Sequence, residues 1–212
     1  MVASCAMKHV RVVACTAFAK GALDSVTAKE GASALGVELV SEELTIERAS
    51  DALRKLELPF TPDLMDRSLW CLYSTAARMA HDEGAKVILL GQLADEQFGG
   101  YAKYAEALKT GGEDSARMMM QADFRDYALR GRLRDVGACA PWAEPRLPFE
   151  ANDLVELASS LPVSFKIRNG VRKAVLRKAA TILGVPGVQA GAAKKAAQYS
   201  SGIQKLVASL PF

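Results

Sequence analysis

The segment 87–101 constrains the fold more than any other part of the chain. It reads Val-Ile-Leu-Leu and then Gly-Gln-Leu-Ala-Asp-Glu-Gln-Phe-Gly-Gly-Tyr. A short apolar run of this kind predicts a buried parallel strand. The glycine and acidic pair that follow predict a crevice at the carboxyl edge of a sheet, where open α/β folds bind nucleotides. Backbone without a Cβ can approach a ligand, and a carboxylate there can hold Mg²⁺ on phosphates. The alternative is a polar turn with a solvated acidic pair.

Length and composition are those of a globular chain with ample core. The chain has 212 residues, of which 50% are hydrophobic and 24% charged. The net charge of +3 does not favour nucleic acid as a partner. The four cysteines form no CxxC pair, which favours reduced cytosolic thiols over zinc or disulfides. No signal peptide and no membrane-spanning stretch is present, so we expect a cytoplasmic protein without a membrane partner.

The first hundred residues alternate between strand and helix patterns. Strands are expected at 10–17, 37–40 and 87–90. Helices are expected from Asp24 or Ser25 to about Leu35, from 41–47 through Leu56, and over 65–82 after a start near Asp63. This alternation predicts a doubly wound parallel sheet.

The second half has a different pattern. Residues 101–134 and 151–183 show helical periodicity with almost no strand signal, and the break falls near 141–148. We therefore expect an α/β part over 1–105 and a mostly helical part over 106–212, packed together as one unit.

Charged residues in the second half form three further features. Glu144 and Arg146 stand two apart between prolines and can hydrogen-bond around a fixed turn, although a structural ion pair would look the same. Lys173 and Arg177 share one helix face, which costs energy unless an anion lies opposite, although a solvated basic face is the commoner explanation. Residues 194–195 are both lysine and precede a glycine, which suggests a flexible basic flap.

Taken in order, these motifs resemble the synthetase domain of asparagine synthetases over nearly the whole chain. That family belongs to the ATP pyrophosphatases, which have an adenine nucleotide α-hydrolase-like fold. The pieces Asp-Glu-x-Phe-Gly-Gly-Tyr and Glu-x-Arg-x-Pro-Phe are specific to this family and to close relatives such as β-lactam synthetases and lasso-peptide cyclases. The piece Lys-x-x-Leu-Arg is a weaker match.

The resemblance implies a reaction and a set of site residues. In the family, a substrate carboxylate attacks the α-phosphorus of ATP, pyrophosphate leaves, and an amine displaces AMP from the acyl-adenylate. Lys173 matches a lysine that stabilises charge on the phosphates, and Glu144 and Arg146 match a pair that shapes the substrate side. Asp95 matches the ligand of Mg²⁺. The residues assigned to the nucleotide are Ala17, Gly91, Gln92, Asp95, Glu96 and Arg177.

Two departures from the family pattern matter. Gln92 stands where the family often has an acidic residue, and an amide cannot act as a general base. The phosphate loop Ser-Gly-Gly-x-Asp-Ser has no intact copy, and the nearest string, residues 20–25, is out of register. A truncated chain, a natural remnant without catalysis, or a loop from another polypeptide would each explain this, and we favour truncation.

The expected function is an ATP-dependent amide-forming ligase that converts aspartate to asparagine, inactive as the chain is printed. The alternatives are a related AMP-forming amidotransferase acting on another carboxylate, and a non-catalytic remnant of the fold. The expected small-molecule partners are ATP, aspartate or another carboxylate, and ammonia. A separate glutaminase subunit and a homo-oligomer stay open.

Overall fold

The protein forms two compact units in a computed structural model that describes residues 1–186 and 197–210. Unit 1 comprises Met1–Cys5, Leu89–Arg130 and the described residues from Leu147 to 186. Unit 2 comprises Ala6–Ile88, Gly131–Arg146 and the described residues 197–210. The division expected at residues 105 and 106 stays a prediction, and the basic flap at 194–195 lies outside the described residues.

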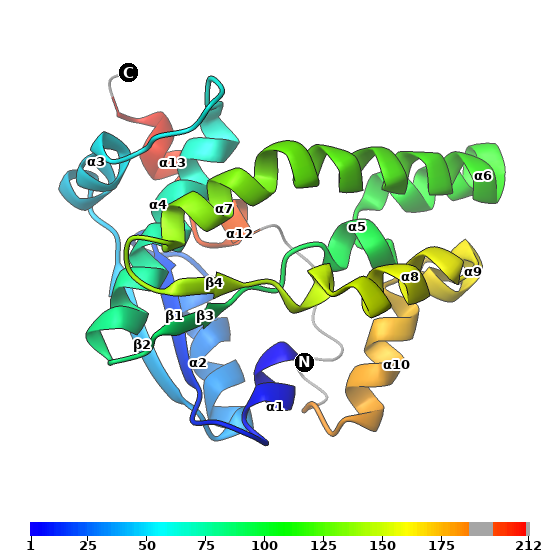
Figure 1. The fold of residues 1–212 in the computed structure, drawn as a ribbon, viewed down its shortest axis with the longest axis horizontal. Helices are drawn as coiled ribbons and strands as arrows, with labels where there is room; N and C mark the ends of the chain where they lie inside the picture. Colours follow the sequence, from blue (N-terminus) through cyan, green and yellow to red (C-terminus); the bar gives the residue numbers. More distant parts are fainter. Residues whose placement is uncertain (187–196, 211–212) are drawn as a thin grey trace. The chain divides into compact units, whose positions relative to one another are not determined.

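Unit 2 contains a parallel strand pair joined by a helix (Figure 1). Strand β1 (Val13–Phe18) pairs with β2 (Glu38–Glu43), and helix α2 (Asp24–Leu35) lies between them in sequence. Gly36 ends α2 with a φ of 66°, as its position in the sequence predicts. The connection is the βαβ arrangement expected of the first residues.

The helix expected to begin within 41–47 does begin there, at Ile46, but residues 41–43 form strand rather than helix. Strand β2 continues to Glu43 because its pairing with β1 extends to Phe18, which overrides the local helix propensity of its glutamates. Helix α3 (Ile46–Arg54) begins only after Thr45, whose hydroxyl accepts the Arg48 amide.

Helix α4 (Leu64–Asp82) begins where the sequence predicts it. Asp63 accepts the amide of Asp66 at 2.8 Å, and Asp66 accepts the amide of Asp63 at 3.2 Å, which makes a capping box. Asp66 also accepts a hydrogen bond of 2.9 Å from Arg134 of α7 (Arg132–Cys139), and Arg134 reaches Asp135 at 2.7 Å. All three charged groups are buried, and they compensate one another.

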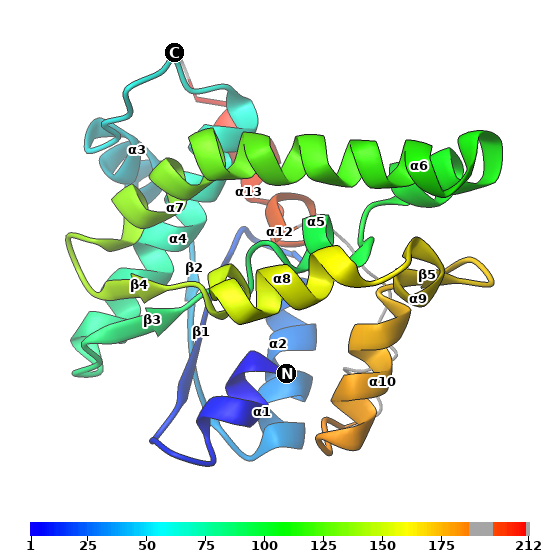
Figure 2. The ribbon, with the colours of Figure 1, turned by 45° about the vertical axis from the view of Figure 1, so that its right-hand side comes forward.

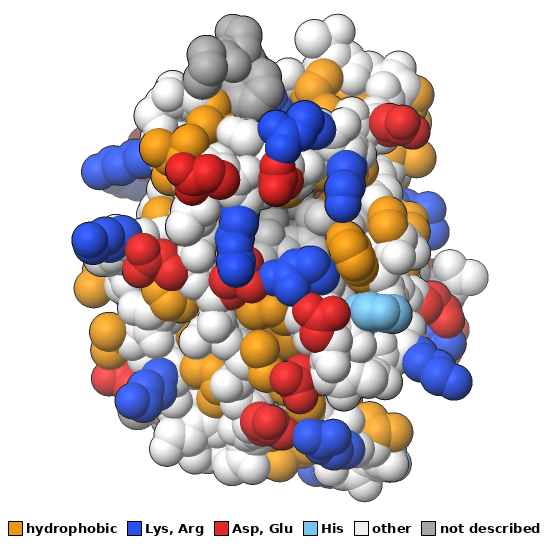
Figure 3. Space-filling model, turned by 90° about the vertical axis from the view of Figure 1, so that its left-hand side faces the viewer, with side chains coloured by type: hydrophobic (Ala, Val, Ile, Leu, Met, Phe, Trp, Pro, Cys, Tyr) orange, Lys and Arg blue, Asp and Glu red, His pale blue; other side chains and the backbone are white. Residues whose placement is uncertain are grey.

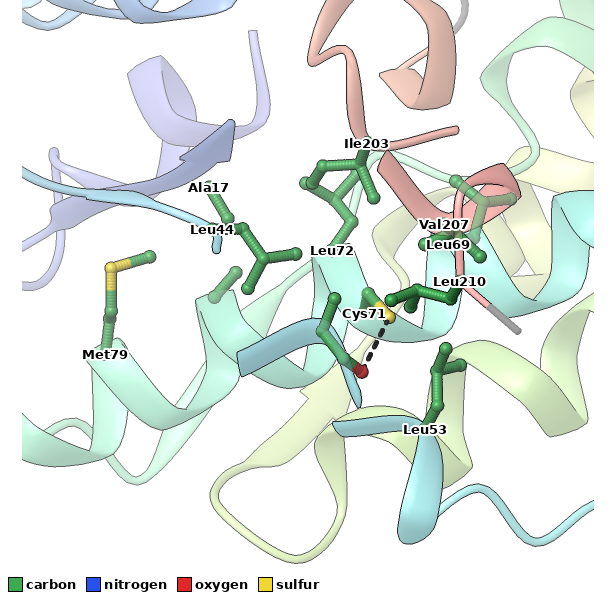
Figure 4. Packing of buried hydrophobic residues seen from close by; sticks show 12 residues of the cluster. Ala17, Leu44, Leu53, Leu69, Cys71, Leu72, Met79, Ile203, Val207 and Leu210 are labelled. Carbon is green, nitrogen blue, oxygen red and sulfur yellow. Dashed lines mark hydrogen bonds between the residues drawn. The ribbon is translucent and has the colours of Figure 1, made fainter. Parts of the chain in front are cut away.

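The core of unit 2 forms where α3, α4, β1 and the C-terminal helices meet (Figure 4). Helices α12 (Ala197–Ser200) and α13 (Ile203–Ala208) close it with Ile203 and Val207, which are almost fully buried. The thiol of Cys71 points at the Ala49 carbonyl at 3.7 Å, and burial raises the pKa of this thiol to about 12. Cys71 therefore acts as a packing residue rather than a nucleophile.

Strand β3 (Val87–Leu89) pairs only with the short strand β4 (Glu144–Arg146) in the part of the chain that the structure describes. Ile88 packs toward the core, whereas Val87 and Leu89 are 36% and 38% exposed. The expectation of a buried strand is therefore wrong, because only the face that carries Ile88 packs against the core and the other face is open to solvent. The described residues form three two-stranded sheets, so the mixed α/β class is confirmed and the doubly wound sheet is not.

Unit 1 is mostly helical, as the periodicity predicts. Helix α6 (Ala102–Asp126) reverses direction at Gly112, and its two halves lie side by side (Figures 1 and 2). Tyr104 in the first half donates a hydrogen bond of 2.5 Å to Asp123 in the second. The unit 1 core combines Tyr104 with Val163 and Ile167.

The remaining helices and short strands connect the elements described above. They are α1 (Val2–Ala6), α5 (Ala94–Phe98), the π-helix η1 (Tyr127–Gly131), the 3-10 helix η2 (Pro148–Glu150), α8 (Asn152–Ser160), α9 (Val163–Lys166), β5 (Ile167–Arg168), β6 (Val171–Arg172) and α10 (Ala174–Ile182). The β5–β6 hairpin was not expected within 151–183. Its turn is Asn169-Gly170, with φ values of 50° and 76°, which is the pairing that tight hairpins prefer.

The surface mixes charges of both signs. Figure 3 shows acidic and basic side chains interspersed with apolar ones over one face of the molecule. Such a mixture gives little long-range steering. No helix in the two described ranges is both long and apolar enough to cross a membrane.

Replacement of Gly112 by alanine should destabilise unit 1. Gly112 has φ 76° and ψ −173°, a conformation open essentially only to glycine, and a new Cβ would meet no atom within 4 Å. The cost is therefore backbone strain alone, about 1–3 kcal/mol of unfolding free energy measured in urea. Gly91→Ala is the matched control, because Gly91 also has open space and no positive φ. Equal stability of the two variants would contradict this assignment.

Candidate functional site

A strained turn carries Asp95 into unit 1. The chain leaves β3 through Gly91 and Gln92 and enters α5 at Leu93, which is 2% exposed and has a φ of 69°. A buried branched residue rarely adopts this left-handed conformation, and such strain gathers at functional sites. The turn places Asp95 in the first turn of α5.

Asp95 forms an ion pair with Lys173 of unit 1. The Lys173 Nζ atom lies 3.1 Å from Asp95 Oδ1, and the two side chains are 22% and 18% exposed. Screening by salt is weaker for such partly buried charges than for surface pairs. Lys173 also has a left-handed backbone, with φ 55°, at the N-cap of α10. Of the three non-glycine residues with positive φ in the described ranges, one is therefore Lys173 itself and another is Leu93, two residues before Asp95.

Gly100 forms the floor beneath the pair. A Cβ on Gly100 would stand 1.7 Å from Asp95 Oδ1 and 2.5 Å from the Lys173 Cε atom, so no side chain fits. The amide of Gly100 donates to the Asp95 carbonyl at 2.8 Å and closes α5. The glycine pair of the sequence motif thus has a physical reason, since its second member lets the two charged groups approach.

Glu96 is the next residue of α5. Its side chain is buried and accepts the Tyr101 hydroxyl at 2.7 Å. Burial and the neighbouring Glu96 carboxylate raise the pKa of Tyr101 well above its usual range, so Tyr101 stays a hydrogen-bond donor. The next residue, Gln97, donates to the Phe149 carbonyl at 2.5 Å. The Glu96 carboxylate therefore anchors α5, and its expected contact with a nucleotide stays a prediction.

The other residues assigned to the nucleotide within unit 1 are Gly91, Gln92 and Arg177. Gly91 is exposed with open space around its Cα, and Gln92 is half-buried in the turn. Arg177 donates through Nε to the carbonyl of Arg172 at 3.0 Å. Their roles toward ATP stay predictions.

Ala17, Glu144 and Arg146 belong to unit 2, and their place relative to the Asp95–Lys173 pair stays a prediction. Arg146 Nε donates to Glu144 Oε1 at 2.9 Å, as their spacing suggests, with both side chains 61% exposed. Glu144 also lines an open cavity of about 630 Å³ with His81 and Trp142. Ala17 is fully buried in the core of unit 2.

The donor set suits a metal ion that is shared with phosphates. Among the described residues, no three His, Cys, Asp or Glu side chains gather closely enough to hold a metal by themselves. Magnesium commonly uses one or two carboxylates and completes its shell with water and substrate phosphates. Asp95, in a cradle that a Cβ on Gly100 would fill, fits that mode.

Two residues at the site, and one buried lysine of the same unit, escaped the sequence analysis. Gly100 was quoted only as part of the motif, although its place after Gly99 marked a close approach. Arg172 donates through Nη1 to the Gly100 carbonyl at 2.9 Å, and no local pattern separates it from the other arginines nearby. Lys166 is buried at the end of α9, where a helical pattern predicts an ordinary surface lysine.

A sequence model of one family covers most of this structure. The asparagine synthase model matches residues 1–144 and 109–206. The chain belongs to the asparagine synthase family. Membership agrees with the resemblance found in the motifs, and the segment that carries Asp95 and the one that carries Lys173 both fall within the matched ranges.

Curated relatives carry related names. The chain is 27% identical to the protein "Putative asparagine synthetase (glutamine-hydrolyzing) 1" of Methanocaldococcus jannaschii, over 98% of the chain and 44% of that protein. It is 32% identical to asparagine synthetase domain-containing protein 1 of Mus musculus, over 65% of the chain and 22% of that protein. A similar Drosophila melanogaster protein is 30% identical over 66% of the chain. The chain thus spans less than half the length of these relatives.

Lys166 should make stability depend on pH. Burial, and to a lesser degree the charge of Arg117, lowers the pKa of Lys166 from 10.5 to about 8. Between these values the unfolded chain holds a proton that the folded chain has lost, so unfolding free energy should rise as pH rises from about 8. Urea unfolding at pH 7 and 9 should show Lys166→Met gaining less over this interval than the unchanged protein. An identical pH response in both would rule out this cause.

Proposed function

We propose that the protein acts as the synthetase part of an ATP-dependent, amide-forming ligase of the asparagine synthetase type. The observation that carries this proposal is the Asp95–Lys173 pair above the bare backbone of Gly100. The family resemblance assigns the acidic member, Asp95, to the Mg²⁺ ion on the pyrophosphate group. It assigns the basic member, Lys173, to the phosphates of the same nucleotide. Family membership supports the reaction class, and the substrate, cofactor and residue roles belong to the proposal.

The proposed reaction has two steps. In the first, an oxygen of the substrate carboxylate attacks the α-phosphorus of ATP, and the bond to the β-phosphate oxygen breaks to release pyrophosphate. In the second, an amine attacks the acyl carbon, loses a proton and displaces AMP. Aspartate and ammonia would give asparagine, while another carboxylate would make the protein a related amidotransferase.

Each residue at the pair has a role in the first step. Negative charge grows on the departing pyrophosphate, and a cation fixed beforehand stabilises it without reorganisation. Lys173 is placed to supply that charge, and Asp95 would hold Mg²⁺, which offsets phosphate charge when it is bound. With no nucleotide present, the two side chains neutralise each other at 3.1 Å, and ligand binding would exchange this pair for contacts to phosphate and metal.

The remaining expected residues complete the proposal. Gly91 would lie against the nucleotide through its backbone, as would Ala17, with Gln92, Glu96 and Arg177 around it. Glu144 and Arg146 would shape the substrate side. The 212 residues contain no Ser-Gly-Gly-x-Asp-Ser loop, so turnover is proposed to require that loop from an extended N-terminus or from another chain. A separate glutaminase subunit is one source of the ammonia.

Pyrophosphate release should depend on both members of the pair. The assay uses a form extended at its N-terminus to carry the Ser-Gly-Gly-x-Asp-Ser loop, with ATP, Mg²⁺ and aspartate. Asp95→Asn and Lys173→Met should each lower the rate by about 100-fold or more, since each removes a charge aimed at the phosphates. Lys178→Met, which alters an exposed lysine on the same helix, is the control and should keep full activity.

Three outcomes of this assay bear on the proposal. Undiminished release by Asp95→Asn would remove Asp95 from the site. Release with a different acid, and none with aspartate, would favour an amidotransferase for that acid. No release with any acid, together with no binding of ATP, would favour a non-catalytic remnant of the fold.

Binding of ATP should be sensitive to a methyl group at residue 91. Gly91→Ala places a Cβ in open space, and Gly91 has no positive φ, so the folded protein should be as stable as before. A nucleotide lying against this backbone would nevertheless be displaced, and calorimetry with MgATP should show affinity lower by about tenfold, or 1.4 kcal/mol. Unchanged affinity together with unchanged melting would place the nucleotide elsewhere.

A further inference from the structure

Two arginines hold the backbone around Lys173 from both sides. The Arg172 Nη1 atom donates to the Gly100 carbonyl at 2.9 Å, and the Arg177 Nε atom donates to the Arg172 carbonyl at 3.0 Å. The amide of Arg177 also donates to the Lys173 carbonyl at 2.9 Å. Lys173 thus lies between two residues whose guanidinium groups are directed at main-chain oxygens.

The β5–β6 hairpin, which carries Arg172, is packed against the core of unit 1. Ile167 of β5 is 4% exposed and packs in the unit 1 core, and it pairs directly with Arg172 of β6. A Cβ on Gly99 would meet the Ile167 side chain at 2.7 Å, so the glycine turn rests on this hairpin. The position of Arg172 is therefore set by buried apolar packing, before its charge contributes.

Lys173 needs such support because of its backbone. Its φ of 55° and ψ of 34° are left-handed, and its side chain makes no capping hydrogen bond to the start of α10. A lysine adopts this conformation only where surrounding contacts over-determine it. The left-handed step turns the chain from β6 into α10, and the ammonium group of Lys173 ends 3.1 Å from Asp95.

We propose that Arg172 is the positioning residue that fixes Lys173 against Asp95, with Arg177 as its support. Arg172 is the last residue of β6, directly before Lys173, and it bonds the carbonyl of Gly100, the residue beneath the ion pair. Arg177 holds the carbonyl at the end of that strand from the first turn of α10. Both arginines act through main-chain oxygens, so their contribution is geometric. The effect of this positioning on catalysis rests on the function proposed above.

The contacts favour this role over direct binding of an anion. An arginine waiting for phosphate presents its planar fork to the ligand, whereas Arg172 directs its Nη1 donor at a carbonyl and is half-buried. The alternative, in which Arg172 binds the nucleotide, predicts weaker ATP affinity and an unchanged environment for Lys173.

Acylation of lysines in the unliganded chain tests the proposal. The full chain is treated briefly with an N-hydroxysuccinimide ester of acetate, and the rate at each lysine is read by mass spectrometry. Arg172→Met removes the donor, and Lys173 should then react about tenfold faster, which corresponds to 1.4 kcal/mol of lost ordering. Arg172→Lys keeps a cation that can reach the carbonyl and should restore part of the protection.

Matched controls separate positioning from simple stabilisation. Arg168→Met alters the exposed arginine on the other strand of the same hairpin and should leave Lys173 unchanged. Lys166, which is buried in the same unit, should react at one rate in all variants. A rise at Lys166 as large as the rise at Lys173 would mean that Arg172 only stabilises the unit. An unchanged rate at Lys173 in Arg172→Met would also overturn the proposal.

The result is independent of whether the protein is a ligase, because the acylation uses no ATP and no substrate. In the extended form that releases pyrophosphate, Arg172→Met should lower kcat about tenfold with little change in KM for ATP, since a misplaced Lys173 affects the transition state more than the bound nucleotide. A raised KM with unchanged kcat would show instead that Arg172 contacts the nucleotide.

Discussion

The approach of Asp95 and Lys173 over Gly100 is the constraint on which the rest of unit 1 depends. Two charges can be partly buried only when they compensate each other, and they compensate well only at short distance. That distance requires a residue without a Cβ beneath them, and left-handed turns at Leu93 and Lys173. The neighbouring contacts of Glu96 with Tyr101 and of Gln97 with Phe149 then hold α5 in place.

Unit 2 is stabilised mainly by an apolar core and not by a partly exposed ion pair. Its core is apolar, and a buried charged cluster of Arg134 with Asp66 and Asp135 joins α4 to α7. Their mutual pairing explains their burial as structural. The strain in the described chain lies instead in unit 1, at the turns around the ion pair and at the Asn169 turn of the hairpin that leads to it. That contrast is the physical ground for placing the candidate site there.

Much of the local structure could be predicted, and the failures have identifiable causes. The start of α4 at Asp63 and the end of α2 at Gly36 followed from capping chemistry, which acts between near neighbours. The extension of β2 to Glu43 did not, because pairing with distant residues of β1 decided it, and the exposure of one face of β3 did not, because it depends on which face packs on the core. The β5–β6 hairpin was hidden because two-residue strands leave no periodicity to read.

The sequence by itself determined which residue types reach the site, because the motifs with Asp95, Lys173 and the Gly99–Gly100 turn are readable as strings and carry the family resemblance. Only the tertiary structure decided that Asp95 and Lys173 meet and that Arg172 bonds the Gly100 carbonyl. The reason is that a motif fixes local backbone and chemistry within a few residues. A contact across 72 positions, such as that between Arg172 and Gly100, depends on how hydrophobic faces such as Ile167 and Tyr104 pack, which no local pattern records.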